Sequence, residues 1–178
     1  KIKETTRFPN SAVVGLKLDS EQFPSIPKRS YKIRGKKVRI PHNATVRADG
    51  SLSYSGTFLG AWHVNGVTKR VIPKWTTDPA WILYDLLTNT RYGLGSQILT
   101  PAELQEATQG KKDANGSFVT LGDGGRVYFD LEFDVATNLD IYSFQQASAY
   151  CGDLVDDGQG GTEPRFSCNI ILQTQQDA

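Results

Sequence analysis

The sequence lacks methionine altogether and holds only two cysteines and two histidines in 178 residues. Without Met a native start is missing, so we expect the chain to be an internal piece of a longer protein. Two histidines outside any H-E-x-x-H pattern, with Cys151 and Cys168 lacking paired spacing, exclude a structural zinc site. The two thiols could be buried and free or joined in a disulfide. No apolar run approaches the ~20 residues that a membrane-spanning helix needs.

Charge is divided unevenly along the chain, although the formal net charge is only +1. Residues 1–50 hold 12 Lys and Arg against 4 Asp and Glu, whereas residues 101–178 hold 4 against 13. Such polarity is compatible with self-association, and it is also compatible with two separately solvated faces. The second interpretation is the simpler one.

Helix-start signals predict two helices, the regular spacing of apolar residues predicts a third, and apolar–polar alternation predicts short β-strands. Asp78, with the proline after it, is an N-cap for a helix that should end near Asn89. Thr100 and Glu103 form a capping box for a second helix that should stop at Gly110. Strands are expected at residues 11–18, 31–34, 36–40, 52–58, 61–64, 69–72, 117–121, 127–135 and 166–172, and a third helix at residues 140–155.

These elements predict an α+β fold, a β-rich mixed domain with hairpins and about three helices. Whether the hairpins close into a small barrel is left open by the sequence. The chain can be divided into a β-rich lobe at residues 11–72 and a helix-plus-strand lobe at residues 73–178, with an inserted hairpin around residues 111–138. Trp75 and Trp81 lie at a helix entry, where core packing is the usual role of an aromatic side chain.

The basic stretch at residues 28–39 is the first candidate interaction site, with Lys32, Arg34, Lys36 and Arg39 as its candidate residues. On a β-barrel it could bind single-stranded nucleic acid. It could also be the polar face of a hairpin, or it could pair with an acidic stretch within one chain or between subunits. We prefer the polar face, then the pairing, then nucleic acid.

The acidic stretch is the second candidate, because a strand at residues 127–135 would place Asp130, Glu132 and Asp134 on one face. Neighbouring carboxylates would lie ~7 Å apart, and a pair of carboxylates could serve a glycosidase. A solvated strand face is the more common role of such alternation, and catalysis would also need a cleft that shifts one pKa. No nucleophile elbow, phosphate-binding glycine loop or complete EF-hand loop occurs, so we predict no catalytic, cofactor-binding or metal-binding residue.

Two long stretches resemble the tail-tip attachment (host specificity) proteins of lambda-like long-tailed phages and related prophages. The first is PKWTTDPAWILYDLLTNTRYGLG at residues 73–95, and the second begins with YCGDLV at residue 150 and continues through a glycine-rich segment to residue 174. Residues 19–23 and 27–34 resemble the same proteins, so the match covers most of the chain. The segment from about residue 100 to 138 is longer than the family pattern.

The resemblance implies a structural virion component at the distal tail tip and not an enzyme. It implies a homotrimer, made in the host cytoplasm, that contacts neighbouring tail proteins and has no cofactor. Parts of the parent protein outside this chain would contact the host surface. Two alternatives remain: a glycan-degrading tail enzyme that uses the acidic stretch, and a nucleic-acid-binding β-barrel that uses the basic stretch.

Overall fold

The computed structural model describes residues 25, 34–121, 124–129 and 131–169, and Arg34–Ala178 form a compact unit of their own. The strand expected at residues 11–18 lies outside the described residues, as do residues 31–33 and 170–172 of two other expected strands. The described elements are β1 (Lys37–Val38), β2 (Ala44–Val46), β3 (Leu52–Tyr54), β4 (Lys74–Trp75), α1 (Pro79–Thr88), α2 (Gly95–Ile98), α3 (Pro101–Gln109), α4 (Ile141–Gly152), β5 (Leu154–Asp156) and β6 (Thr162–Pro164).

The strands pair as three separate antiparallel sheets of two strands each: β1 with β4, β2 with β3, and β5 with β6. The predicted α+β class is confirmed, but the described strands do not close into a barrel. A barrel requires every strand to pair on both sides. These strands are two or three residues long and pair on one side only. The strands expected at residues 61–64 and 69–72 are reduced to isolated bridges, among them Val64 with Val71.

Local capping signals correctly predict where α1 and α3 begin. The Asp78 carboxylate accepts a hydrogen bond from the N–H of Trp81 at 3.0 Å and caps α1. The predicted capping box of α3 is present, with the N–H of Thr100 donating to Glu103 Oε2 at 2.9 Å and the N–H of Glu103 donating back to Thr100 Oγ1. The last residue of α1 is Thr88, and Asn89 is its C-cap, close to the predicted end of the helix.

The other two helices differ from the prediction. α4 begins after Asp140 as expected but ends at Gly152, because the next residues extend into β5 and pair with β6. After α1 the sequence predicts only a turn, and the structure adds the short helix α2. Gly93 and Gly95 bring this turn against the end of α1, where a Cβ on either would overlap a backbone oxygen of Leu86 or Thr88.

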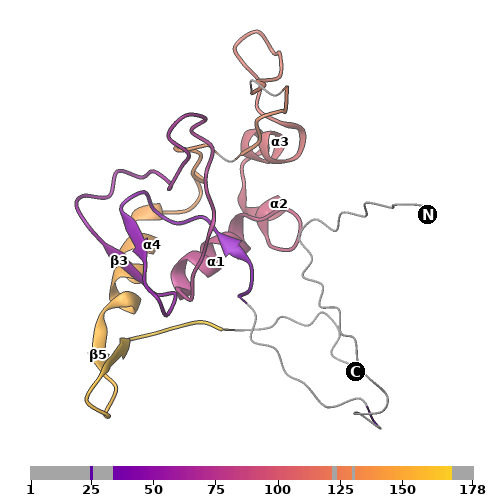
Figure 1. Cartoon of the computed structure of the whole chain (residues 1–178). Helices are drawn as coiled ribbons and strands as arrows, with labels where there is room; N and C mark the ends of the chain where they lie inside the picture. Colours follow the sequence, from indigo (N-terminus) through magenta and orange to yellow (C-terminus); the bar gives the residue numbers. More distant parts are fainter. Residues whose placement is uncertain (1–24, 26–33, 122–123, 130, 170–178) are drawn as a thin grey trace. The chain divides into compact units, whose positions relative to one another are not determined.

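The core lies where α1 meets α4 and the segment around Trp62 (Figure 1). Trp62 and Trp81 are both 0% exposed, and their ring centroids lie 5.5 Å apart in an edge-on arrangement. Tyr84 packs on both tryptophans and on Phe144 of α4, at centroid distances between 5.2 and 5.7 Å. Aromatic pairs of this geometry add about 0.5–1.5 kcal/mol each beyond their buried area.

A closed set of hydrogen bonds joins α1, α4 and β3 inside this core. The Ser148 hydroxyl on α4 donates to Asp78 Oδ2 at 2.7 Å and is also hydrogen-bonded to the Tyr54 hydroxyl of β3. The indole N–H of Trp81 donates to the same Tyr54 hydroxyl at 2.8 Å. Burial raises the pKa of Asp78, and the hydrogen bonds from Ser148 and from the α1 backbone only partly offset this effect.

Replacing Ser148 with alanine should lower the free energy of unfolding by about 1–3 kcal/mol, because a buried carboxylate and a buried phenol would each lose a partner. The folded-state pKa of Asp78 already lies above its unfolded value, so this group favours the folded state at acid pH and loses that contribution as pH rises. The difference in the free energy of unfolding between wild type and Ser148→Ala should therefore grow from acid to neutral pH.

Chemical denaturation at several pH values would measure this difference. Gln146→Ala is the matched control, because Gln146 is exposed on the same helix and its replacement should change stability by no more than about 0.5 kcal/mol. A Ser148→Ala loss no larger than that of the control would contradict the role given to the hydrogen bonds.

Gly50→Ala should destabilise the protein more than Gly56→Ala, although both glycines have positive φ, at 91° and 71°. A Cβ at Gly50 would lie 2.6 Å from Trp75 Cζ3 and 2.9 Å from Thr77 Cγ2, whereas nothing lies within 4 Å of one at Gly56. Gly56→Ala should cost about 1–2 kcal/mol for backbone strain alone, and Gly50→Ala should add about 1–3 kcal/mol for the overlap. Thermal unfolding of both variants would measure this, and equal losses would show that Trp75 moves aside freely.

Candidate interaction surface

The basic stretch does not form one solvated stripe in the described residues. The guanidinium of Arg34 lies 5.0 Å from the centre of the Trp75 ring, and the Lys36 ammonium lies 3.5 Å from the centre of the Tyr92 ring. Burial lowers the pKa of Lys36, and the charge of Asp85 opposes this effect. Lys32 lies outside the described residues. Arg34 and Lys36 are therefore each held over an aromatic face, where the attraction is worth about 0.5–1 kcal/mol at exposed sites.

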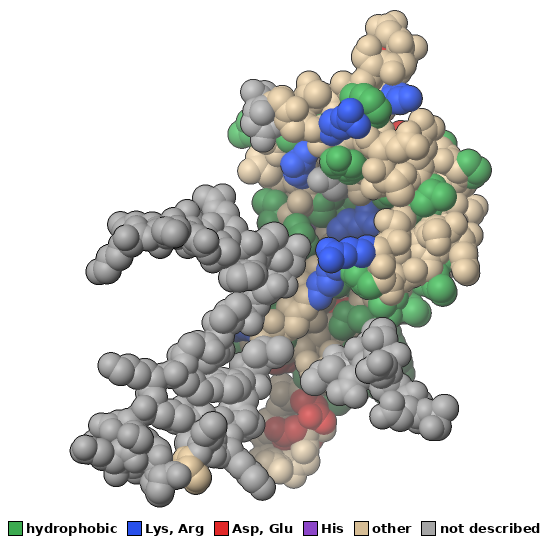
Figure 2. Space-filling model, turned by 90° about the vertical axis from the view of Figure 1, so that its right-hand side faces the viewer, with side chains coloured by type: hydrophobic (Ala, Val, Ile, Leu, Met, Phe, Trp, Pro, Cys, Tyr) green, Lys and Arg blue, Asp and Glu red, His purple; other side chains and the backbone are tan. Residues whose placement is uncertain are grey.

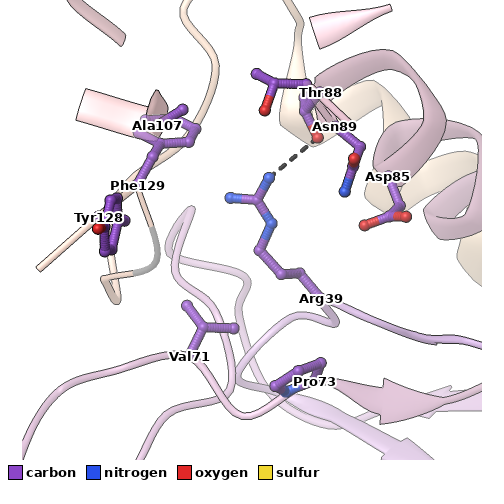
Figure 3. Close-up of a pocket in the computed structure, with 10 residues that line it drawn as sticks. Arg39, Val71, Pro73, Asp85, Thr88, Asn89, Ala107, Tyr128 and Phe129 are labelled. Atoms are coloured by element: carbon purple, nitrogen blue, oxygen red, sulfur yellow. Dashed lines mark hydrogen bonds between the residues drawn. The ribbon is translucent and has the colours of Figure 1, made fainter. Parts of the chain in front are cut away.

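Arg39 turns inward from the same stretch. Its guanidinium lies 5.3 Å from the centre of the Trp62 ring and 5.4 Å from that of Phe129. It donates to Thr88 Oγ1 at 3.0 Å and to the backbone oxygen of Asp134 at 3.4 Å. Figure 3 shows the side chain extending into a cavity of about 380 Å³ toward the end of α1. Arg39 thus ties α1 to the segment around Asp134.

The acidic stretch is not the regular strand that its alternation predicts. In the described part of residues 127–135 the strand pairing is limited to a single bridge at Leu131, and the chain then turns so that the N–H of Asp134 donates to the Leu131 oxygen at 3.2 Å. Phe133, expected on the buried face, is 65% exposed. The turn is held by the Asp134 carboxylate, which accepts from the Leu131 N–H at 2.9 Å. A side-chain contact therefore overrides the period-two pattern.

The described carboxylates of this stretch are each bound to a lysine from another part of the chain. Asp134 Oδ1 lies 2.9 Å from the Lys111 ammonium, and a Glu132 oxygen lies 3.4 Å from that of Lys69. Burial lowers the pKa of Lys111, but the hydrogen bond and charge of Asp134 outweigh it and raise the pKa. Asp130 lies outside the described residues. Within the described chain, Arg39 reaches only the backbone of Asp134 and not its carboxylate.

A second cavity gathers basic side chains that are distant in the sequence. This cationic groove, of about 450 Å³, has Val46, Ile72 and Pro73 as apolar lining residues, and its remaining lining residues are Arg34, Gly35, Lys37, Arg47, Ala48, Lys74 and Trp75. The groove lies beside the β1–β4 sheet, in which Lys37 pairs with Trp75. Figure 2 shows one face of the molecule, on which Lys and Arg side chains lie in several separate clusters among hydrophobic and other side chains. Sequence reasoning missed Arg47 and Lys74 because no local pattern joins them to residues 28–39.

An acidic hairpin, β5–β6, carries the opposite charge. Its turn is held by its own carboxylates: Asp156 Oδ1 accepts from the Gly158 N–H at 2.7 Å, and Asp157 Oδ1 accepts from the N–H groups of Gln159 and Gly161. Those N–H donors lower the pKa of Asp157, so its carboxylate stays ionised at neutral pH. Glu163 is exposed on the same hairpin.

The part of the chain that the structure describes holds no group of three or more His, Cys, Asp or Glu side chains that could bind a metal ion. Cys151 and Cys168 are free thiols in the structure, and both are half-buried where burial was expected. Among the described helices, none combines the length and apolar character needed to cross a membrane.

Arg39→Ala should lower the free energy of unfolding by about 2–4 kcal/mol, because it removes charge-assisted hydrogen bonds and the contacts with Trp62 and Phe129. Lys37→Ala, two residues earlier and exposed, should change it by no more than about 0.5 kcal/mol. Urea unfolding of the two variants would measure both. Similar losses would mean that Arg39 is as solvated as Lys37.

Comparison with known proteins found no matching protein-family model. Two curated relatives match nearly the whole chain. The Tip attachment protein J of Escherichia phage SECphi27 is 30% identical over 173 residues, and that of Escherichia phage SECphi4 is 28% identical over 172 residues, each covering 97% of this chain. The chain spans only about a tenth of the length of these relatives, 10% of the first and 11% of the second. The resemblance found in the sequence is thus confirmed, and the chain is homologous to a segment of the phage proteins named Tip attachment protein J.

Proposed function

We propose that this chain is a structural segment of a phage tail-tip attachment protein and that it mediates contacts between subunits at the distal end of the tail. The observation that carries the proposal is the similarity over 97% of the chain to a segment of two proteins named for tip attachment. In this proposal the protein is a virion component, made in the host cytoplasm, and it assembles as a homotrimer beside neighbouring tail proteins. Contact with the host surface belongs to other parts of the parent protein.

The way in which the described charged side chains are used supports a scaffold. Arg39 and Asp134 are bound between elements that are far apart in sequence, and the cap of α1 is tied to α4 through Ser148. Such contacts keep the relative positions of helices and loops fixed. The groove and the acidic hairpin remain as charged surfaces for other molecules.

A glycan-cleaving function is the alternative that the acidic stretch raised, and we infer that the chain is not an enzyme. A glycosidase needs one carboxyl group to be protonated and a second to be free to attack or to activate water. Asp134 is engaged by Lys111 and by the Leu131 N–H, and Glu132 is paired with Lys69. Neither the 380 Å³ cavity nor the cationic groove is lined by Glu132 or Asp134.

Electron microscopy of the parent phage, labelled with an antibody raised against this chain, would test the proposal. We expect label at the distal tail tip, and none on heads or along the tail tube. The antibody must first be shown to bind the native chain, and tails without label should be labelled again after partial dissociation, which exposes covered surfaces. Continued absence of label from dissociated tails would overturn the virion assignment.

A further inference from the structure

The cationic groove holds two lysines, Lys37 and Lys74, for which no counter-charge is found among the described residues. In the described part of the chain, Lys37 and Lys74 are in no ion pair, and no Asp or Glu lines the groove. Arg34 is positioned over Trp75, and Arg47 is fixed by donating to the Gly152 oxygen at 2.7 Å and to Ser51 Oγ at 3.1 Å. Like charges held together beside apolar lining residues favour an anionic occupant.

The acidic hairpin has the charge and the shape that such a groove would accept. Asp156, Asp157 and Glu163 lie on one exposed hairpin, and three glycines occur within its turn. Glycine lacks a side chain, so the backbone of this turn can approach another surface closely. The hydrogen bonds from the turn N–H groups to Asp156 and Asp157 hold the hairpin in one conformation, which lowers the entropy lost on binding.

The hairpin is also placed to reach another molecule. In Figure 1 it projects from the end of α4 at the edge of the compact unit. Arg47, which lines the groove, donates to the Gly152 oxygen at the base of the hairpin, and the acidic turn lies at the opposite end of the β5–β6 pair from that base. The two surfaces therefore belong to different parts of one chain, and a donor surface that meets a different acceptor surface gives a head-to-tail contact.

We propose that the cationic groove of one copy binds the acidic β5–β6 hairpin of a second copy. This inference rests on the proposed subunit-contact function and names the surfaces that make the contact. Opposite charges would steer the encounter and fix its orientation. The apolar side chains that line the groove would exclude water from the contact. A head-to-tail contact closes into a ring when its rotation permits, as the proposed trimer requires.

Sedimentation of the whole chain over a range of concentrations at low and high salt would test the contact. We expect self-association that weakens with salt, and a dissociation constant raised about tenfold or more by Lys37→Glu with Lys74→Glu. Gln159→Lys with Glu163→Lys should have a similar effect and leaves the carboxylates that hold the turn unchanged. The control, Arg91→Glu with Lys112→Glu, makes the same change of net charge away from the groove and should weaken association much less. Circular dichroism would verify folding, and a chain that stays monomeric at its highest soluble concentration would overturn the proposal.

Cross-linking would identify the surfaces directly. A carbodiimide joins amines to carboxylates in contact, and a mixture of nitrogen-14 and nitrogen-15 chains separates links between copies from links within one. We expect mixed-isotope links from Lys37 or Lys74 to Asp156, Asp157 or Glu163, lost at high salt. Mixed links elsewhere, or a groove that binds a single-stranded oligonucleotide while the chain remains monomeric, would overturn the proposal. Label at the tail tip without these links would refute the groove contact alone, and these links without tail-tip label would refute the virion assignment alone.

Discussion

The buried Asp78 carboxylate is the constraint on which the arrangement of the helices depends. One of its oxygens caps α1, and the other accepts from Ser148 of α4, while Tyr54 of β3 connects Ser148 to the indole of Trp81. A carboxylate at this depth is tolerated only because both oxygens are hydrogen-bonded. The same bonds give α1 and α4 a single relative position, because any shift of one helix along the other would leave a buried charge without its partner.

Several of the described cationic side chains lie over aromatic rings. Arg39 lies among aromatic rings at the centre, Arg126 lies over Phe118 at 3.7 Å, and Arg165 lies over Tyr150 at 4.4 Å. The planar guanidinium can stack on a ring and still donate hydrogen bonds at its edge. The described strands are only two or three residues long, so they form no extended ladders of hydrogen bonds. Contacts between guanidinium groups and aromatic rings connect segments that such ladders would otherwise join.

The sequence predicted best what is decided locally. Helix caps involve atoms within three residues, so Asp78 and Thr100 were correctly predicted as helix starts from their caps, and the regular spacing of apolar residues correctly predicted a helix that begins after Asp140. The prediction of a strand at the acidic stretch was wrong because the Asp134 carboxylate binds a distant lysine, Lys111, and closes a turn with the Leu131 N–H. The alternating pattern of the sequence shows neither contact. The groove could not be predicted, since Arg47 and Lys74 join Arg34 and Lys37 only after β1 has paired with β4.

Three glycines lie closely against the backbone of another segment. A Cβ on Gly93, Gly95 or Gly152 would overlap the backbone oxygen of Leu86, Thr88 or Leu52. A contact between main-chain atoms does not depend on which side chains surround it, provided that the glycine is retained. A substitution at any of these three positions must therefore move main chain, which no rotation of a neighbouring side chain can accommodate.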